Sequence, residues 1–364
     1  MNLESDNPVG RVPDAQRHRR ATLSFGSNGW RLGRKRGPWD SSLSTALAQL
    51  DTKHSLSIVG DAPNTDARTM VAQFVQQAVG RGTTITRLPE EISTQLPEKL
   101  REAVRSPIQG NPGEFLWDAR AVQQRRAALV PLISIAPTVS AVLVSKRPEL
   151  VRSMVQRLSA LNYPHLEIVV GMHGAAAPKD LQTVANKRQL VVKEFHASEI
   201  FGDVVDSAFA MASGELLTKV DDDDFYGDDY LWDLVAAHKY SSATLVGKTT
   251  TIVYLEAIDT TVRRVFGSPE SYTNRVAGGT MLISAEDLRE LGGWPSLPRA
   301  IDSALIKTVT NAGGLIYQPH DIGYLYVRQQ DASSHTWNTD ISRFLVNANE
   351  QWVGLLRHPS LGTK

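Results

Sequence analysis

Short apolar runs rich in β-branched residues alternate along the chain with segments in which apolar residues recur every three or four positions. In the C-terminal part, the apolar runs predict four strands, at residues 139–145, 166–170, 190–193 and 216–220. Helical spacing predicts a helix over 147–161, which Pro148 opens, and another over 204–212, which Gly214 ends. Strand–helix repeats of this kind predict an α/β fold with a doubly wound, mostly parallel sheet.

A shorter alternation of the same kind fills residues 41–126. It predicts strands at residues 55–59 and 83–86 and helices at residues 70–78 and 114–127. We expect a small Rossmann-like α/β domain with a parallel sheet. Residues 60–64 follow its first strand and are interpreted as a plain turn or as a phosphate-binding loop that lacks the glycine-rich fingerprint.

The remaining segments are distinguished by their composition. Residues 1–40 are rich in Gly, Arg, Pro and Ser, and between Arg11 and Arg36 eight basic residues stand against one acidic residue. Because no apolar periodicity is evident there, we expect a basic flexible arm, and contact with an anionic polymer or peripherally with a membrane is the more specific interpretation. The chain is thus divided into an arm (1–40), a small domain (41–126), a linker (127–136), a larger domain (137–340) and a C-terminal helix or tail (341–364).

Composition and charge exclude several classes of protein. The 364 residues include no cysteine, which excludes disulfides, thiolate metal sites and cysteine nucleophiles. Residues 1–136 carry 18 Lys and Arg against 13 Asp and Glu, a net charge of +5, whereas residues 137–340 carry 18 against 25, a net charge of −7. We therefore expect no nucleic-acid partner for the larger domain, and its acidity suits a divalent cation.

Residues 127–145 carry no charged side chain over 19 positions, which approaches the length of a membrane span. Pro131, Pro137 and several hydroxyl side chains interrupt this stretch. We therefore favour a linker followed by a buried strand over a transmembrane helix. The N-terminus lacks the apolar core of a signal peptide, and we expect a cytoplasmic protein.

Four consecutive aspartates, residues 221–224 and here called the acidic cluster, directly follow the fourth predicted strand of the larger domain. Ligands of doubly wound sheets bind beyond the carboxyl ends of strands, which is where this cluster lies. Like charges so close together repel, and Mg²⁺ or Mn²⁺, which prefer oxygen ligands, would neutralise them. The alternative is a solvated acidic turn that caps the next helix with Asp228 and Asp229. We favour the metal site.

Five segments together resemble glycosyltransferase family 2, whose members have the GT-A fold. Residues 139–149 are similar to the family's opening strand and nucleotide-binding loop, and residues 201–215 to the helix before the metal strand. Residues 217–231 are similar to the metal strand with its Asp-x-Asp motif. Residues 278–294 are similar to the acceptor-side strand and turn, and residues 299–302 to the segment with the catalytic aspartate. The resemblance implies a metal-dependent, inverting glycosyltransferase that uses a nucleotide sugar, with UDP as the implied nucleotide. The Gln-x-x-Arg-Trp motif of processive members is missing, which implies transfer of a single sugar.

The resemblance also implies roles for single residues. The implied donor-binding residues are Ser145, Arg147, His173, Asp221 and Asp222. The implied metal ligands are Asp221, Asp223 and His335, and Asp302 is the implied general base that takes the proton of the acceptor hydroxyl.

Several of these assignments have plainer alternatives. Asp302 would instead serve as the N-cap of a helix over 303–311, His335 as a loop histidine and His173 as a turn residue. We expect a structural role for His238. Stacking on an acceptor sugar and burial in the core are both open for Trp294 and Trp337.

The chain departs from the family at two points. Residues 171–174 read Gly-Met-His-Gly where the family often has a nucleoside-binding aspartate, and Ile301 stands where a glutamate usually precedes the catalytic aspartate. Residues 41–126 resemble, more faintly, part of a GT-B glycosyltransferase, and a scaffold or docking domain is the favoured alternative. Rival functions are a sugar nucleotidyltransferase and a non-catalytic carbohydrate-binding or assembly protein. The acceptor stays open among a glycan, a lipid-linked sugar, a protein and a small metabolite.

Overall fold

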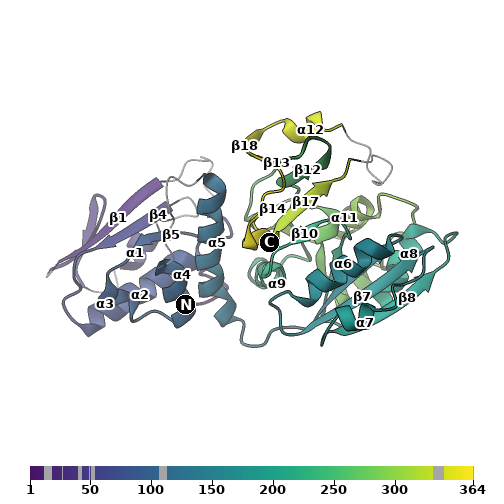
Figure 1. Ribbon diagram of the computed structural model, residues 1–364. Helices are drawn as coiled ribbons and strands as arrows, with labels where there is room; N and C mark the ends of the chain where they lie inside the picture. The colour runs from purple at the N-terminus through teal and green to yellow at the C-terminus, as the bar shows by residue number, and fades with distance from the viewer. Residues whose placement is uncertain are drawn as a thin grey trace. The chain divides into compact units, whose positions relative to one another are not determined.

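The computed structural model describes residues 1–11, 19–26, 28–39, 43–48, 50, 54–105, 113–330 and 340–363. The chain forms two compact units, Met1–Ser134 and Ile135–Lys364, which are shown in Figure 1 and are taken here one at a time. The division between them falls within the predicted linker at 127–136, but the first part of that segment is helical. It holds the end of helix α5 (Glu114–Leu129) and the 3-10 turn η1 (Val130–Leu132).

The C-terminal unit is built on an eight-stranded, mostly parallel sheet. Its strands in spatial order are β14 (Ser271–Tyr272), β16 (Ile316–Gln318), β11 (Leu245–Val246), β15 (Leu282–Ser284), β9 (Leu216–Val220), β6 (Val139–Ser145), β7 (Leu166–His173) and β8 (Gln189–Phe195). The run from β9 through β6 and β7 to β8 is parallel, and β15 pairs with β9 in the antiparallel sense. The predicted fold class is confirmed, because the four predicted strands form the parallel core of this sheet.

Helices connect the parallel strands and cover the sheet. They are α6 (Pro148–Ser159), α7 (Leu181–Val184), α8 (Phe201–Ala210), α9 (Tyr230–Ser241), α10 (Ala285–Glu290) and α11 (Ile301–Asn311). The chain moves from β6 to β7 in one direction and from β8 back to β9 in the other. Right-handed crossovers therefore put α6 and α8 on opposite faces. On the face of α8, Val205 and Phe209 pack with Val142 of β6 and Leu305 of α11.

A second sheet in the same unit has five strands. They are β10 (Phe225–Tyr226), β17 (Tyr324–Arg328), β12 (Ile252–Leu255), β13 (Thr260–Arg264) and β18 (Ala348–Val353), in that spatial order. The prediction of a C-terminal helix or tail over 341–364 is wrong for most of the segment, where helix α12 covers only Ser342–Leu345 and β18 pairs antiparallel with β13. The six residues of β18 show little apolar alternation, so pairing with β13, rather than local pattern, makes them a strand.

The N-terminal unit contains a five-stranded sheet, and its existence corrects the prediction of a flexible arm over residues 1–40. The strands are β3 (Lys35–Gly37), β2 (Gly29–Leu32), β1 (Arg19–Gly26), β4 (His54–Val59) and β5 (Thr84–Arg87), in spatial order. Three of them come from the supposed arm. Its apolar residues are few, but Leu23, Trp30 and Leu32 lie opposite one another or in neighbouring strands and are at most 5% exposed.

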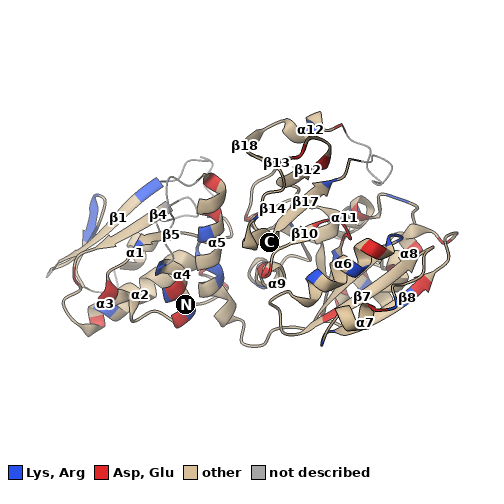
Figure 2. Cartoon of the chain, viewed as in Figure 1, with Lys and Arg blue, Asp and Glu red and all other residues tan. Residues whose placement is uncertain are grey.

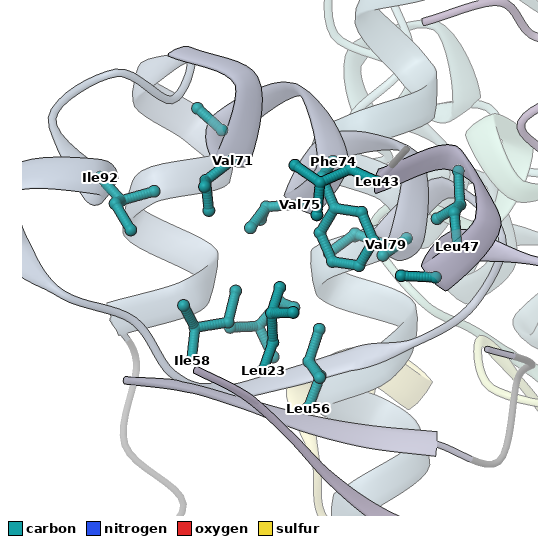
Figure 3. Packing of buried hydrophobic residues seen from close by; sticks show 14 of the residues in the cluster. Leu23, Leu43, Leu47, Leu56, Ile58, Val71, Phe74, Val75, Val79 and Ile92 are labelled. Atoms are coloured by element: carbon teal, nitrogen blue, oxygen red, sulfur yellow. The ribbon is translucent and has the colours of Figure 1, made fainter. Parts of the chain in front are cut away.

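Five helices complete this unit. They are α1 (Leu43–Leu47), α2 (Thr65–Gly80), α3 (Glu90–Ser93), α4 (Glu98–Arg105) and α5. Figure 3 shows Leu23, Leu56 and Ile58 pointing from the sheet toward Phe74 and Val75 of α2, and all five side chains are buried. Asn64 caps α2, because its side chain accepts a hydrogen bond from the amide of Ala67, which indicates a helix-capping turn after β4.

Deletion of residues 1–40 should therefore unfold the N-terminal unit, where a flexible arm would be dispensable. The deletion removes the central strand β1 together with Leu23, Phe25 and Trp30 from the core. Hydrogen exchange of peptides from α2 and β4 should rise to the level of an unfolded chain. As point controls, Leu23→Asp should have the same effect, whereas Thr22→Asp, at the exposed neighbouring position, should not. Retained protection of α2 in the deletion variant would contradict this expectation.

Among the described helices, none is both long and apolar enough to cross a membrane. The uncharged stretch at 127–145 contributes instead the end of α5, η1 and the buried strand β6.

Candidate active site

The acidic cluster lies at the topological switch point of the large sheet. From β6 the chain proceeds to β7 and β8 on one side and then returns to form β9 on the other side of β6. The cluster follows Val220, the last residue of β9, and Ser145 ends the adjacent β6. In open α/β sheets this crevice is where ligands bind. The position predicted for the acidic cluster is thus the position at which a doubly wound sheet presents a ligand site.

Asp222 is held by two residues that were predicted to bind the donor. It accepts hydrogen bonds from the Nε of Arg147 at 3.0 Å, from the Nη2 of Arg147 and from the hydroxyl of Ser145. The amide of Arg147 in turn donates to the Ser145 oxygen at 2.9 Å. The loop after β6 and the start of the acidic cluster therefore form one hydrogen-bonded group, in which Asp222 is 6% exposed.

Asp223 lies beside the same guanidinium group. Its Oδ2 accepts from the Nη2 of Arg147 at 2.9 Å and from the Nε2 of Gln329 at 2.9 Å, and Gln329 follows β17 directly. Burial and the negative charge of Asp222 raise the pKa of Asp223 to about 6, against the opposing charge of Arg147. Gln329 was not among the residues singled out from the sequence, and no motif there distinguishes it.

Asp224 has a structural position. It is fully buried and accepts hydrogen bonds from the hydroxyl of Tyr324 at 2.6 Å and from the amide of Val327 at 2.9 Å. Burial, together with the charge of Asp223, raises its pKa well above the usual value. Asp224 thereby joins the end of the first sheet to β17 of the second.

Asp221 and Asp302 meet at Lys219, a residue that the sequence analysis missed. The Nζ of Lys219 lies 2.7 Å from the Oδ1 of Asp221 and 3.6 Å from the Oδ1 of Asp302. Burial alone would lower the pKa of Lys219, but the two carboxylates raise it above its ordinary value. The available signal was a single lysine in the otherwise apolar or small strand β9, two residues before the acidic cluster.

Two consecutive glycines let the backbone approach both carboxylates. A Cβ on Gly278 would stand 2.0 Å from the Oδ2 of Asp302, and a Cβ on Gly279 would stand 2.6 Å from the Oδ2 of Asp221. The hydroxyl of Tyr226 fixes this approach, because it donates to the carbonyl of Gly279 and accepts from the amide of Asp221, each at 2.8 Å. The segment that resembles an acceptor-side strand is therefore in contact with the predicted catalytic aspartate.

Asp302 is not the helix N-cap of the alternative interpretation. Helix α11 begins at Ile301, its N-cap is Ala300 in the left-handed region with φ of 58°, and no side chain caps it. Asp302 stands inside the first turn, with Oδ1 buried and making no hydrogen bond among the described residues, while the side chain as a whole is 34% exposed. Burial raises the pKa of Asp302, and nearby Lys219 opposes that rise.

The other predicted residues make different contacts or lie outside the described residues. His173 ends β7, where its Nε2 is 3.1 Å from the carbonyl oxygen of Glu199 and its ring stacks on Phe201. Trp294 is 5% exposed and packs on Phe209, which places it in the core. His335 and Trp337 fall in 331–339, outside the described residues.

No group of three or more His, Asp or Glu side chains with the geometry of a metal site occurs in the part of the chain that the structure describes. The three aspartates after Asp221 are engaged by protein donors instead, at Arg147, Ser145, Gln329, Tyr324 and the amide of Val327.

No protein-family model matches the chain, and no curated protein sequence matches it significantly. Among solved structures, residues 1–349 of S. aureus TarS in complex with UDP-GlcNAc match with a TM-score of 0.43 and 16% identity, over 58% of this chain and 68% of that one. The complex of the same TarS fragment with UDP matches with a TM-score of 0.41 and 18% identity, over 53% and 61%. The mannosyltransferase PcManGT from Pyrobaculum calidifontis, in complex with GDP-Man and Mn²⁺, matches with a TM-score of 0.40 and 14% identity, over 72% and 68%. Similarity this low assigns no activity to the chain, so the function is argued from the site.

Proposed function

We propose that this protein is a metal-dependent, inverting glycosyltransferase that moves a single sugar from a nucleotide sugar, with UDP as the nucleotide, to a hydroxyl acceptor. The observation that carries the proposal is the meeting of Asp221 and Asp302 at Lys219, beyond the carboxyl end of β9. A switch-point crevice that holds both a cluster of carboxylates and a separate carboxylate from a following helix suits a reaction with an anionic leaving group and a proton to remove.

The donor side of the site consists of the acidic cluster and Arg147. Mg²⁺ and Mn²⁺ are commonly held by one or two carboxylates while substrate phosphates supply further oxygens, so the oxygen donors of Asp221 and Asp223 fit such an ion without a complete protein cage. When bound, the ion would neutralise the diphosphate leaving group. Arg147 is charged and 23% exposed, and it would add hydrogen-bond donors for phosphate oxygens at the same edge.

The acceptor side is Asp302. Its buried Oδ1 lies toward Lys219, while the exposed part of the carboxylate is available to a substrate hydroxyl. The carboxylate takes the hydroxyl proton as the acceptor oxygen bonds to the anomeric carbon, and the bond from that carbon to the diphosphate oxygen breaks. Attack from the side opposite the leaving group inverts the anomeric configuration, and the products are the glycoside and a nucleoside diphosphate.

The rival functions differ in what they release. A transferase slowly hydrolyses its donor in the absence of acceptor and releases nucleoside diphosphate. A sugar nucleotidyltransferase would release pyrophosphate from a nucleoside triphosphate, and a binding protein would release nothing. Incubation with a set of nucleotide sugars, and separately with nucleoside triphosphates and sugar 1-phosphates, each with and without Mn²⁺, separates the three. Absence of nucleoside diphosphate release from every donor would overturn the proposal.

Asp223→Ala should weaken Mn²⁺-dependent UDP binding at least about tenfold, because loss of a metal ligand should cost no less than loss of a residue that only orients such a ligand. The fold should survive, since the substitution relieves repulsion within the cluster. Calorimetry of UDP binding with Mn²⁺ and with EDTA measures the effect. Asp203→Ala, at an exposed position in the first turn of α8, is the matched control and should bind as the wild type does. Unchanged Mn²⁺-dependent affinity in Asp223→Ala would contradict the assignment.

A further inference from the structure

Within the described part of the N-terminal unit, the apolar core packs against one face of the sheet. The connections from β1 to β4 and from β4 to β5 advance in one direction along a parallel sheet, so right-handed crossovers put α1 and α2 on the same side. Residues from α3 and α4, including Ile92 and Leu100, belong to the same core cluster as Leu23 and Leu56. All of this apolar contact is made by alternate residues of the strands, and the residues between them form the other face.

This second face, here called the open face, is mostly polar, and its arginines are accessible. The pairing register assigns to it Arg20, Thr22, Ser24, Arg31, Arg36, Ser55, Ser57, Val59, Thr84 and Arg87. Its four arginines and Thr22 are exposed, Ser24, Ser57 and Val59 are half-buried, and Ser55 and Thr84 are buried. None of its members is aromatic or acidic.

The charge of the sheet is entirely of one sign. The five strands contain six basic side chains and no Asp or Glu, namely Arg19, Arg20, Arg31, Lys35, Arg36 and Arg87. Figure 2 shows blue segments and no red ones along β1 and the strands beside it. Arg31 lies directly opposite Arg36, although like charges in that relation destabilise a sheet. Within the described part of the chain, neither has an acidic side chain in ion-pair contact.

The open-face residues form a band across all five strands. Arg36, Arg31 and Ser24 are consecutive partners on β3, β2 and β1. Two residues before Ser24 on β1, Thr22 pairs with Ser57 of β4. A register shift places Arg87 of β5 opposite Ser57. Four steps between neighbouring strands make the band about 19 Å long. Cations therefore occupy both ends of the band, and its middle holds hydroxyl groups together with Val59, the partner of Ser24 on β4.

We propose that the open face binds a linear, phosphate-bearing polyanion in an extended conformation. Every basic residue in the band is an arginine, whose planar fork matches phosphate oxygens in pairs, and the serine and threonine hydroxyls between them add further donors. The face lacks the aromatic side chains that anchor proteins in a lipid interface or stack on nucleotide bases. A flat band that crosses the sheet suits a chain rather than a small ion.

Binding of fluorescently labelled linear inorganic polyphosphate to the full chain tests the proposal, by anisotropy over a range of salt concentrations. The double variant Arg31→Gln with Arg36→Gln should weaken binding at least about tenfold and reduce the slope of log affinity against log salt by about 1 to 2. The matched control is Arg19→Gln with Lys35→Gln. It removes the same charge from β1 and β3, but at positions that share the helix-covered side of the sheet with Leu23 and Leu32.

The control should stay within about threefold of the wild type, and both double variants should keep wild-type thermal unfolding. Equal weakening by the two double variants would overturn the proposal, because the effect would then be one of net charge. Stronger binding to phosphatidylglycerol vesicles than to polyphosphate would overturn it in favour of a membrane surface. Stronger binding to a single-stranded DNA of equal phosphate number would overturn it in favour of base recognition. Donor hydrolysis by the Arg31→Gln and Arg36→Gln variant should be unchanged, so this test fails or succeeds independently of the proposed transferase activity.

Discussion

Asp302→Asn should slow sugar transfer at least about a hundredfold while donor binding and thermal stability remain near those of the wild type. Removal of a general base typically costs 10²- to 10⁴-fold in rate, or about 3–5 kcal/mol in the barrier. Asn is almost isosteric with Asp and keeps the approach of Gly278, but it cannot take up a proton. Initial rates of nucleoside diphosphate release with acceptor, together with calorimetry of UDP binding, measure the two effects separately.

The matched control is Asp203→Asn, the same change at an exposed position in the first turn of α8. It should alter neither rate nor affinity. The pH dependence gives a second readout, because burial raises the pKa of Asp302 and the base must be ionised to act. The wild-type rate should therefore fall as pH decreases through that raised pKa, and the Asn variant should lack this fall. A rate in Asp302→Asn within a few-fold of the wild type would place the base elsewhere.

The parallel core of the larger unit could be predicted because its strands are local signals. β6, β7 and β9 are almost continuously buried, so their sequences are mostly apolar whatever their neighbours are. The acidic cluster follows such a run directly, and the order of strands and helices is enough to place it at a switch point. The approximate location of the site thus follows from the sequence alone.

Strands β1 to β3 could not be predicted in the same way. β1 has three apolar residues at alternate positions, β2 has two and β3 has none apart from its glycine, and basic residues dominate the composition of the segment. Leu23 and Leu32 become a core only through pairing across two strands and through helices that come later in the chain. Composition therefore indicated an arm where tertiary contact builds a sheet.

The partnership of Lys219, Asp221 and Asp302 is also beyond local pattern. Asp302 is 81 positions after Asp221 in the chain, and only the antiparallel pairing of β15 with β9 brings the glycines before β15 against both carboxylates. A family resemblance can point to Asp302, but it gives no reason for a buried lysine between the two acids. That reason is electrostatic, because two carboxylates so placed require a nearby cation to remain charged.

Lys248→Met should destabilise the C-terminal unit by about 3–5 kcal/mol, the cost expected when one partner of a buried ion pair is removed. Lys248 is fully buried, and its Nζ donates to the carbonyls of His320 at 2.9 Å and Ile322 at 2.7 Å and lies 3.4 Å from the Oδ2 of Asp233. Its backbone also bonds to the hydroxyl of Thr280, in the turn that carries the glycine pair of the site. The substitution would leave the Asp233 carboxylate buried beside His320 without the lysine charge that faces it.

Because the chain has two units, the loss is best measured by hydrogen exchange of peptides from β6, β9 and α9 in increasing urea, which reports on the C-terminal unit alone. Lys239→Met, at an exposed position in the last turn of α9, is the matched control and should cost less than about 0.5 kcal/mol. The double variant Lys248→Met with Asp233→Leu should regain at least half of the lost stability, because it removes the charge left without a cation. A loss of stability below about 1 kcal/mol in the single variant, or no recovery in the double variant, would contradict this expectation. Packing rather than charge would then determine the contribution of Lys248 to the stability of the C-terminal unit.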